Sequence, residues 1–140
     1  MSTWFYQLNQ QLWSPERYRL EIWENERWSW GVGENASTEE PESGDTVAFY
    51  YGHSSGGDPG FYGWAVVLEW LSEEPQIHFR PVRPSDLLKM RPWWEPQAHD
   101  LADRIRGGMK QRTLWQVSDE LARELRDGIT RWTGTSTATR

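Results

Sequence analysis

Residues 44–70 read GDTVAFYYGHSSGGDPGFYGWAVVLEW, and this stretch decides the fold. Two apolar, β-prone runs, at 46–51 and 61–71, stand on either side of a loop of glycine, serine and other turn formers at 52–60. Runs of this length between turn signals are typical of neighbouring buried strands. The stretch therefore predicts two strands joined by a polar loop, with aromatic residues on both sides of that loop.

Shorter patterns outside this stretch predict the remaining elements. Strands are expected at 3–8, 77–84 and 113–117, and a helix at 86–90 after a Ser85 cap. Helical spacing of apolar residues predicts two more helices, at 95–106 and at 118–132. The segment 33–45 is polar, lacks periodicity and ends in a Gly44-Asp45 turn, so it is expected to be a loop.

Residues 14–32 fit two interpretations. Ser14 and Pro15 suit the start of a short helix at 15–20. Residues 18–23 also alternate as a strand does, and a second strand at 27–32 would complete a hairpin. We favour the strand at 18–23, with the helix as its alternative.

Short strands outnumber helices in this order, and an amphipathic helix closes the chain. The fold class predicted is α+β, a small mixed or largely antiparallel β-barrel with helices packed at its ends. A chain of 140 residues suits one domain, expected at 1–132 with a disordered tail at 133–140.

The composition limits the classes of function. The sequence has no cysteine, no apolar run long enough to span a membrane and no secretory signal pattern, so a cytoplasmic protein without membrane contact is expected. Its net charge of −6 argues against nonspecific binding to a phosphate backbone. However, residues 80–112 hold 8 basic and 4 acidic side chains, which permits a local basic face.

The loop at 52–56 also matches the letters of a hydrolase nucleophile elbow, G-x-S-x-G. That turn needs a helix directly after the serine, whereas Ser54 is followed by Ser-Gly-Gly-Asp-Pro-Gly. The three histidines supply neither a base at a convincing spacing nor a two-ligand metal motif. We therefore expect no catalytic residue, no metal and no cofactor.

A binding site fits the same loop better. Residues two apart on a strand share a face, so Phe49 with Tyr51, and Tyr62 with Trp64, are expected to form two aromatic walls. A planar base can stack between such walls while short polar side chains such as Ser54 read its edge.

Several segments together resemble the EVE domain, a member of the PUA-like superfamily that also contains the YTH readers. TWFYQL at 3–8 and WSWGVG at 28–33 resemble its first strand and its Trp-Gly-Val segment. The stretch 44–70 resembles its most specific signature, and residues 108–129 resemble its closing strand and capped helix.

The resemblance implies a PUA-like barrel that holds a flipped, modified nucleobase of DNA or RNA in an aromatic cage: methylated or hydroxymethylated cytosine, or methylated adenine. It implies stacking by Trp30, Tyr51 and Trp64 and edge hydrogen bonds from His53 and Ser54. The other pocket residues implied are Gly31, Val32, Phe61 and Tyr62. Phosphate contacts are assigned to Arg104, Arg106, Lys110 and Arg112.

An alternative function uses the same fold without nucleic acid. The segment GENASTEE at 33–40 is acidic where the family has a polar and basic run, and the whole chain is acidic. These features suit a small-ligand sensor or protein-interaction module of a bacterial defence or signalling system. An open aromatic pocket beside residues 104–112 would favour the base reader, and a pocket filled by its own side chains would favour the interaction module.

Overall fold

The computed structural model describes residues 1–8, 14–32, 39–52, 60–82, 96–108 and 112–133. The predicted helix at 86–90 lies outside these residues, as does all but the first residue of the predicted tail. In chain order the elements are β1 (Thr3–Leu8), α1 (Pro15–Glu21), β2 (Trp28–Gly31), β3 (Thr46–Tyr51), β4 (Gly60–Leu71), β5 (Gln76–Val82), α2 (Pro96–Arg106), β6 (Leu114–Val117) and α3 (Asp119–Thr133).

One six-stranded mixed sheet organises the molecule, in the order β2-β5-β4-β3-β1-β6. β1 pairs with β3 in parallel, and the other four pairings are antiparallel. The predicted α+β class and mixed sheet are confirmed. Within the described pairings β2 and β6 are the two edges of the sheet and do not pair with each other, so the expected barrel is not closed.

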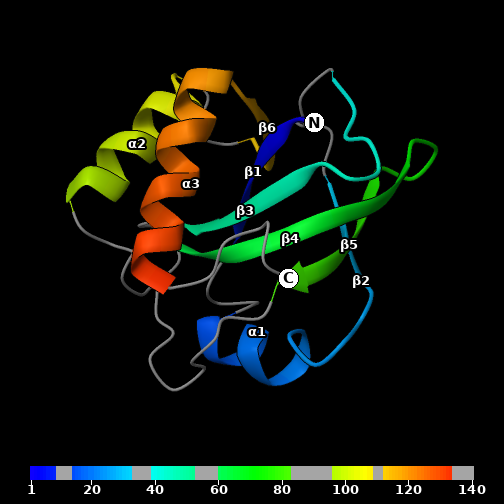
Figure 1. Cartoon of the computed structure of the whole chain (residues 1–140). Helices are drawn as coiled ribbons and strands as arrows, with labels where there is room; N and C mark the ends of the chain where they lie inside the picture. The colour runs from blue at the N-terminus through cyan, green and yellow to red at the C-terminus, as the bar shows by residue number, and fades with distance from the viewer. Residues whose placement is uncertain (9–13, 33–38, 53–59, 83–95, 109–111, 134–140) are drawn as a thin grey trace.

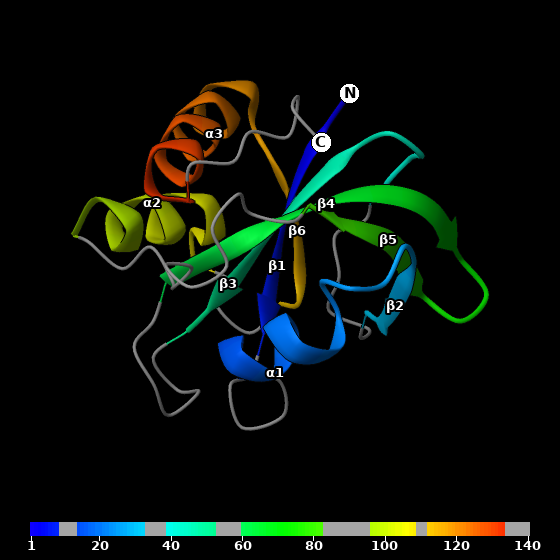
Figure 2. The ribbon, with the colours of Figure 1, turned by 60° about the horizontal axis from the view of Figure 1, so that its bottom comes forward.

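Helices cover the two faces of the sheet. Figures 1 and 2 show α2 and α3 packed together on one face and α1 alone on the other. The core is accordingly divided into two clusters. The α1-side cluster holds large aromatic side chains from α1, β1, β2, β3, β4 and β5. The α2/α3-side cluster joins Ala98, Leu101, Ala102, Leu125 and Ile129 of the helices to the opposite strand faces.

A β-bulge in β4 decides which aromatic side chain reaches which cluster. Phe49 pairs with Gly63 but Tyr50 pairs with Phe61, so Tyr62 is an extra residue in the β3–β4 ladder. Tyr62 therefore packs in the α1-side cluster, whereas Trp64, two residues later, packs in the α2/α3-side cluster. The prediction that Tyr62 and Trp64 share one wall is wrong, because simple alternation does not hold across a bulge.

Residues 15–21 form a helix, so the favoured strand at 18–23 is wrong and the alternative is correct. The Ser14 hydroxyl accepts a hydrogen bond from the Arg17 N–H, with Pro15 in the first turn. Tyr18 and Ile22 are fully buried while Leu20 is exposed. A helix buries Tyr18 and Ile22 on one side because they are four residues apart, and this packing outweighs the β propensity of the segment.

Asp45 anchors the N-terminus to the turn before β3. Its buried carboxylate accepts hydrogen bonds from the backbone N–H groups of Ser2 and Glu42, at 2.8 and 2.9 Å, and from the Trp4 indole N–H, at 3.0 Å. The preceding Gly44 has φ +94°, a conformation that side chains disfavour, which agrees with the predicted Gly44-Asp45 turn. This network ties the N-terminus and the start of β1 to the turn before β3.

Candidate functional site

The α1-side cluster contains a group of aromatic rings near the end of β3 and the start of β4. We call Tyr18, Trp23, Tyr51 and Tyr62 the aromatic group. The Trp23 and Tyr62 rings stack with centroids 5.5 Å apart and planes within 5° of parallel. Tyr18 meets Tyr62 edge to face at 5.5 Å, and Tyr51 meets Tyr62 at 5.9 Å. All four side chains are at most 2% exposed, so the rings are enclosed within the α1-side cluster.

Polar atoms inside the aromatic group lack hydrogen bonds. Among the residues that the structure describes, the Tyr18 and Tyr51 hydroxyls and the Trp23 indole N–H are buried with no hydrogen-bond partner. By contrast, the Tyr6 hydroxyl on the same side of the sheet donates to the Gly31 carbonyl oxygen at 2.6 Å. An unpaired buried hydroxyl costs roughly 1–3 kcal/mol.

The acidities of these tyrosines reflect the same enclosure. Burial raises the pKa of Tyr18 well above its ordinary value, and the neighbouring Tyr51 and Tyr62 raise it further. A polar interaction with the Trp23 indole N–H lowers the pKa of Tyr18, so Trp23 is the polar neighbour of this hydroxyl, although the two groups do not reach ordinary hydrogen-bond geometry. Burial, followed by the proximity of Tyr62, raises the pKa of Tyr51. The hydroxyls are neutral near pH 7, where each can donate one hydrogen bond and accept another.

The structure brings together some of the predicted pocket residues and separates others. Trp30, Tyr51, Tyr62 and Val32 are all buried in the α1-side cluster, and Gly31 contributes the carbonyl that Tyr6 binds. Phe61 and Trp64 lie in the α2/α3-side cluster, so they contact the opposite face of the sheet. The expectation that Phe61 and Trp64 line one pocket together with Tyr51 is therefore corrected. His53 and Ser54 lie outside the described residues.

Two of the cations assigned to phosphate have partners within the protein. Arg104 forms a two-point contact with Glu124, at 2.5 and 3.0 Å, and also binds Asp100. Arg106 is largely buried, with its side chain 10% exposed; it binds Asp103 and the Gln7 side chain and lies over the Tyr50 ring. Their contact with phosphate stays a prediction. The same holds for the half-buried Arg112 and for Lys110, which lies outside the described residues.

Tyr18 and Trp23 are members of the aromatic group that sequence reasoning did not place there. A strand at 18–23 would bring neither side chain near Tyr51 and Tyr62. The helix cap at Ser14 and the spacing of Tyr18 and Ile22 carried the relevant signal.

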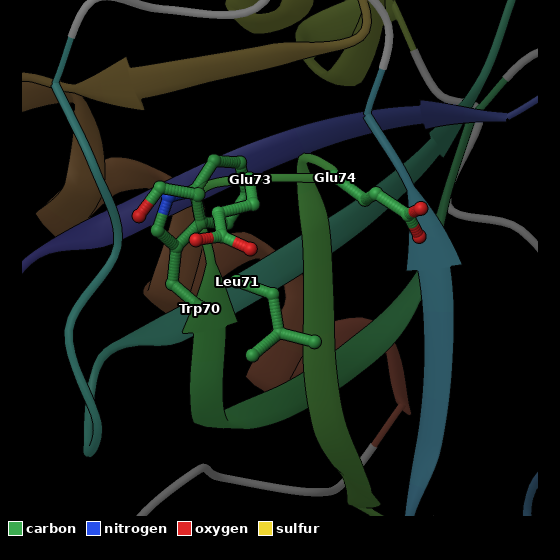
Figure 3. A pocket seen from close by; sticks show the side chains of 5 residues that line it. Trp70, Leu71, Glu73 and Glu74 are labelled. Carbon is green, nitrogen blue, oxygen red and sulfur yellow. The ribbon is translucent and has the colours of Figure 1, made fainter.

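Two cavities lie away from the aromatic group. One, of about 380 Å³, is lined by Arg27, Trp28, Ser29 and His78 at the β2–β5 edge. The other, of about 390 Å³, lies at the β4–β5 turn. Figure 3 shows Glu73 on the same side of that turn as Trp70, and Glu74 extending toward the other side.

Two further types of site are absent from the described parts of the chain. No group of three or more His, Asp or Glu side chains is placed to hold a metal ion. None of the described helices has the length and apolar character that crossing a membrane requires.

No protein-family model matches this sequence, and no curated protein matches it significantly. Solved structures match it in fold. A Pseudomonas putida protein has a TM-score of 0.59 at 13% identity, over 91% of this chain and 99% of its own. The DUF55 domain of human thymocyte nuclear protein 1 has a TM-score of 0.55 at 13% identity, over 89% and 96%.

The human THYN1 protein, solved in complex with DNA containing 5-methylcytosine, has a TM-score of 0.56 at 13% identity, over 89% of this chain and 95% of its own. At 13% identity these matches concern the fold, which this chain shares with THYN1 and its DUF55 domain. The expected resemblance is thus confirmed at the level of the fold.

Proposed function

We propose that this chain is a non-enzymatic module that reads a modified nucleobase, flipped out of a DNA or RNA strand, at the aromatic group. The observation that carries the proposal is the pair of buried, unpartnered hydroxyls of Tyr18 and Tyr51 among stacked rings. A base offers flat faces to the rings and donors and acceptors to the hydroxyls. Methylated or hydroxymethylated cytosine and methylated adenine are the candidate bases.

The fold comparison supports the class of ligand. A chain of the same fold, human THYN1, is described in complex with DNA that contains 5-methylcytosine. For the present chain, the residues that would read the base are its own, and they come from α1, the segment after it, β3 and β4. Trp23 and Tyr62 would supply stacking, and Tyr18 and Tyr51 would supply edge hydrogen bonds.

Stacking and edge hydrogen bonds are of the same order as the cost of flipping a base. Flipping a base costs a few kcal/mol, and stacking on an aromatic ring returns roughly 1–3 kcal/mol per base. Each hydroxyl that gains a partner adds about 0.5–1.5 kcal/mol. A base that lacks the matching group leaves a hydroxyl unpaired, so these contacts would contribute to discrimination.

Base entry requires a local movement, because the four rings are enclosed in the free protein. The element that would move is α1, a helix of 7 residues held on the sheet by the buried side chains of Tyr18 and Ile22, with Trp23 just beyond its end. Short helices with few buried side chains open at lower free energy than the central strands. Ligand binding would then change hydrogen exchange at the α1 amides more than at β1 or β3.

Titration of oligonucleotides tests the proposal. Single-stranded and double-stranded DNA and RNA, each with and without a modified base, are titrated against the wild-type protein. The proposal predicts saturable binding that favours one modification, with altered exchange at α1. Equal and negligible binding of modified and unmodified oligonucleotides of every kind would contradict it.

A second candidate function is a small-ligand sensor or protein-interaction module, and two observations favour it. Tyr51 and Tyr62 are enclosed by their own neighbours, and Arg104 and Arg106 already bind carboxylates of the protein. Under this function the aromatic group is core, and a partner binds elsewhere. The oligonucleotide titration separates the two, because this module would give no binding that depends on a modified base.

A further inference from the structure

The cavity at the β2–β5 edge is lined by hydrogen-bond donors. Ser29 and His78 face each other across the β2–β5 ladder, and Arg27 directly precedes β2. The Trp28 ring completes the described lining of this cavity of about 380 Å³. None of these residues belongs to the aromatic group, so the cavity is a separate feature.

The contact between Arg27 and His78 fixes the proton on the imidazole ring. Arg27 Nη2 donates to Glu69 Oε2 at 2.8 Å and lies 2.9 Å from His78 Nδ1. A guanidinium has no acceptor, so His78 Nδ1 must accept and a neutral His78 carries its proton on Nε2. His78 Nε2 is buried and has no hydrogen-bond partner in the described part of the chain. It is therefore a donor that lacks an acceptor.

A second such donor stands on the same face of β5. His78 and Arg80 alternate with Ile77 and Phe79, whose side chains are in the α1-side cluster. Arg80 Nε is also buried without a partner among the described atoms. Arg80 does not line the cavity itself, and the Arg27 charge there is paired with Glu69.

We propose that this cavity binds a phosphate group, as a monoester or a diester, through Arg27, Ser29 and His78. A tetrahedral oxyanion accepts several hydrogen bonds at once, which matches the guanidinium of Arg27 and the hydroxyl of Ser29; the buried His78 Nε2–H would reach it through a local movement of the ring. The interactions of Arg27 use Nη2 alone, so its other N–H groups are available. The proposal does not depend on base reading at the aromatic group.

The chain offers internal controls for this proposal. Glu69 competes with the anion for Arg27, so removal of its charge is expected to strengthen binding. Arg17 is a matched control, because it also pairs with a glutamate, Glu21, and its side chain is 47% exposed against 50% for Arg27. The cavity at the β4–β5 turn carries Glu73 and Glu74 and is expected to repel the same ligand.

Nuclear magnetic resonance titration tests the proposal through the His78 side chain and the Ser29 amide. The probes are inorganic phosphate, a 5′-mononucleotide and an unmodified DNA oligonucleotide. We expect saturable shifts in the wild type, about tenfold weaker binding in Arg27→Gln, and no change in Arg17→Gln. Glu69→Gln is expected to bind about two- to fivefold more tightly, because a like charge is removed.

The arms of the titration identify the source of the phosphate. Saturation by phosphate and the mononucleotide, but not by the oligonucleotide, assigns the site to a free monoester. Saturation by the oligonucleotide assigns it to a backbone phosphate. The proposal is overturned if none of the probes saturates the His78 and Ser29 signals, or if Arg27→Gln and Arg17→Gln bind equally well.

Discussion

Trp23 and Tyr62 stack face to face, with ring centroids 5.5 Å apart and planes 5° from parallel, although Trp23 follows α1 and Tyr62 belongs to β4. Tyr18 stands perpendicular to both rings. This contact attaches α1 to the sheet at the proposed base site. The stability of α1 and the ability to admit a ligand are therefore linked through the same pair of rings.

Truncation of Trp23 is expected to loosen α1. Trp23→Ala removes a side chain that is 2% exposed, and such truncations cost roughly 3–5 kcal/mol of unfolding free energy. Trp23→Phe keeps an aromatic ring against Tyr62 and should lose less. Urea unfolding measures the stability, and hydrogen exchange measures α1 locally. Unchanged exchange of the α1 amides in Trp23→Ala would show that this stacking does not hold the helix.

Removal of a tyrosine hydroxyl should affect the free energy of unfolding in opposite directions at Tyr51 and Tyr6. Tyr51→Phe deletes an unpaired buried hydroxyl, so the free protein should keep its stability or gain up to about 1 kcal/mol. Tyr6→Phe deletes the hydroxyl that binds the Gly31 carbonyl and should lose about 1 kcal/mol. Thermal and urea unfolding compare the two variants. A larger loss in Tyr51→Phe than in Tyr6→Phe would mean that the Tyr51 hydroxyl has a partner in solution.

Among the polar residues, Asp45 is expected to be the one whose substitution lowers the stability of the fold most. Asp45→Ala leaves the N–H groups of Ser2, Glu42 and Trp4 without their acceptor, and a loss of about 3 kcal/mol is expected. Trp4→Phe removes one of the three hydrogen bonds and keeps most of the ring volume, so it should lose less. Urea unfolding ranks the two. Equal stability of Asp45→Ala and the wild type would contradict the anchoring role of this carboxylate.

The Arg104–Glu124 pair should make a small contribution to stability that depends on pH. The hydrogen bond from Arg104 holds the pKa of Glu124 below its ordinary value of 4.5. Because the folded pKa is the lower one, the contribution is present above the unfolded pKa and is lost as pH falls through the folded pKa. Glu124→Gln should therefore flatten the pH dependence of stability below about pH 4.5. An unchanged acid limb in Glu124→Gln, measured by urea unfolding, would exclude the pair as its source.

The sheet was predictable because its strands carry strong local patterns. β1, β3, β4 and β6 follow the predicted ranges within about one residue at each end, and the caps and apolar spacing located α2 and α3. The short segment at residues 14–23 was not decided by its pattern. The apolar residues of this segment fit both the helical period and the alternation of a strand. The burial of Tyr18 and Ile22 selected the helix.

The candidate site was less predictable than the fold, for two physical reasons. The extra residue in the β3–β4 ladder reverses the face of Tyr62 relative to Trp64, and no local pattern announces it. Contacts distant in sequence also decide which cations are available: Arg104 meets Glu124, which is 20 residues away, in α3. The sequence placed aromatic residues near the correct strand ends, but only the fold determines which rings meet.

The most direct test of the account is the affinity ratio between a modified and an unmodified oligonucleotide in the wild type, Tyr18→Phe and Tyr51→Phe, with Tyr6→Phe as the control. The account predicts that loss of either unpartnered hydroxyl lowers this ratio about 2- to 13-fold, the equivalent of one hydrogen bond, while Tyr6→Phe preserves it. A ratio that is unchanged in both Tyr18→Phe and Tyr51→Phe would contradict the claim that these hydroxyls read the base.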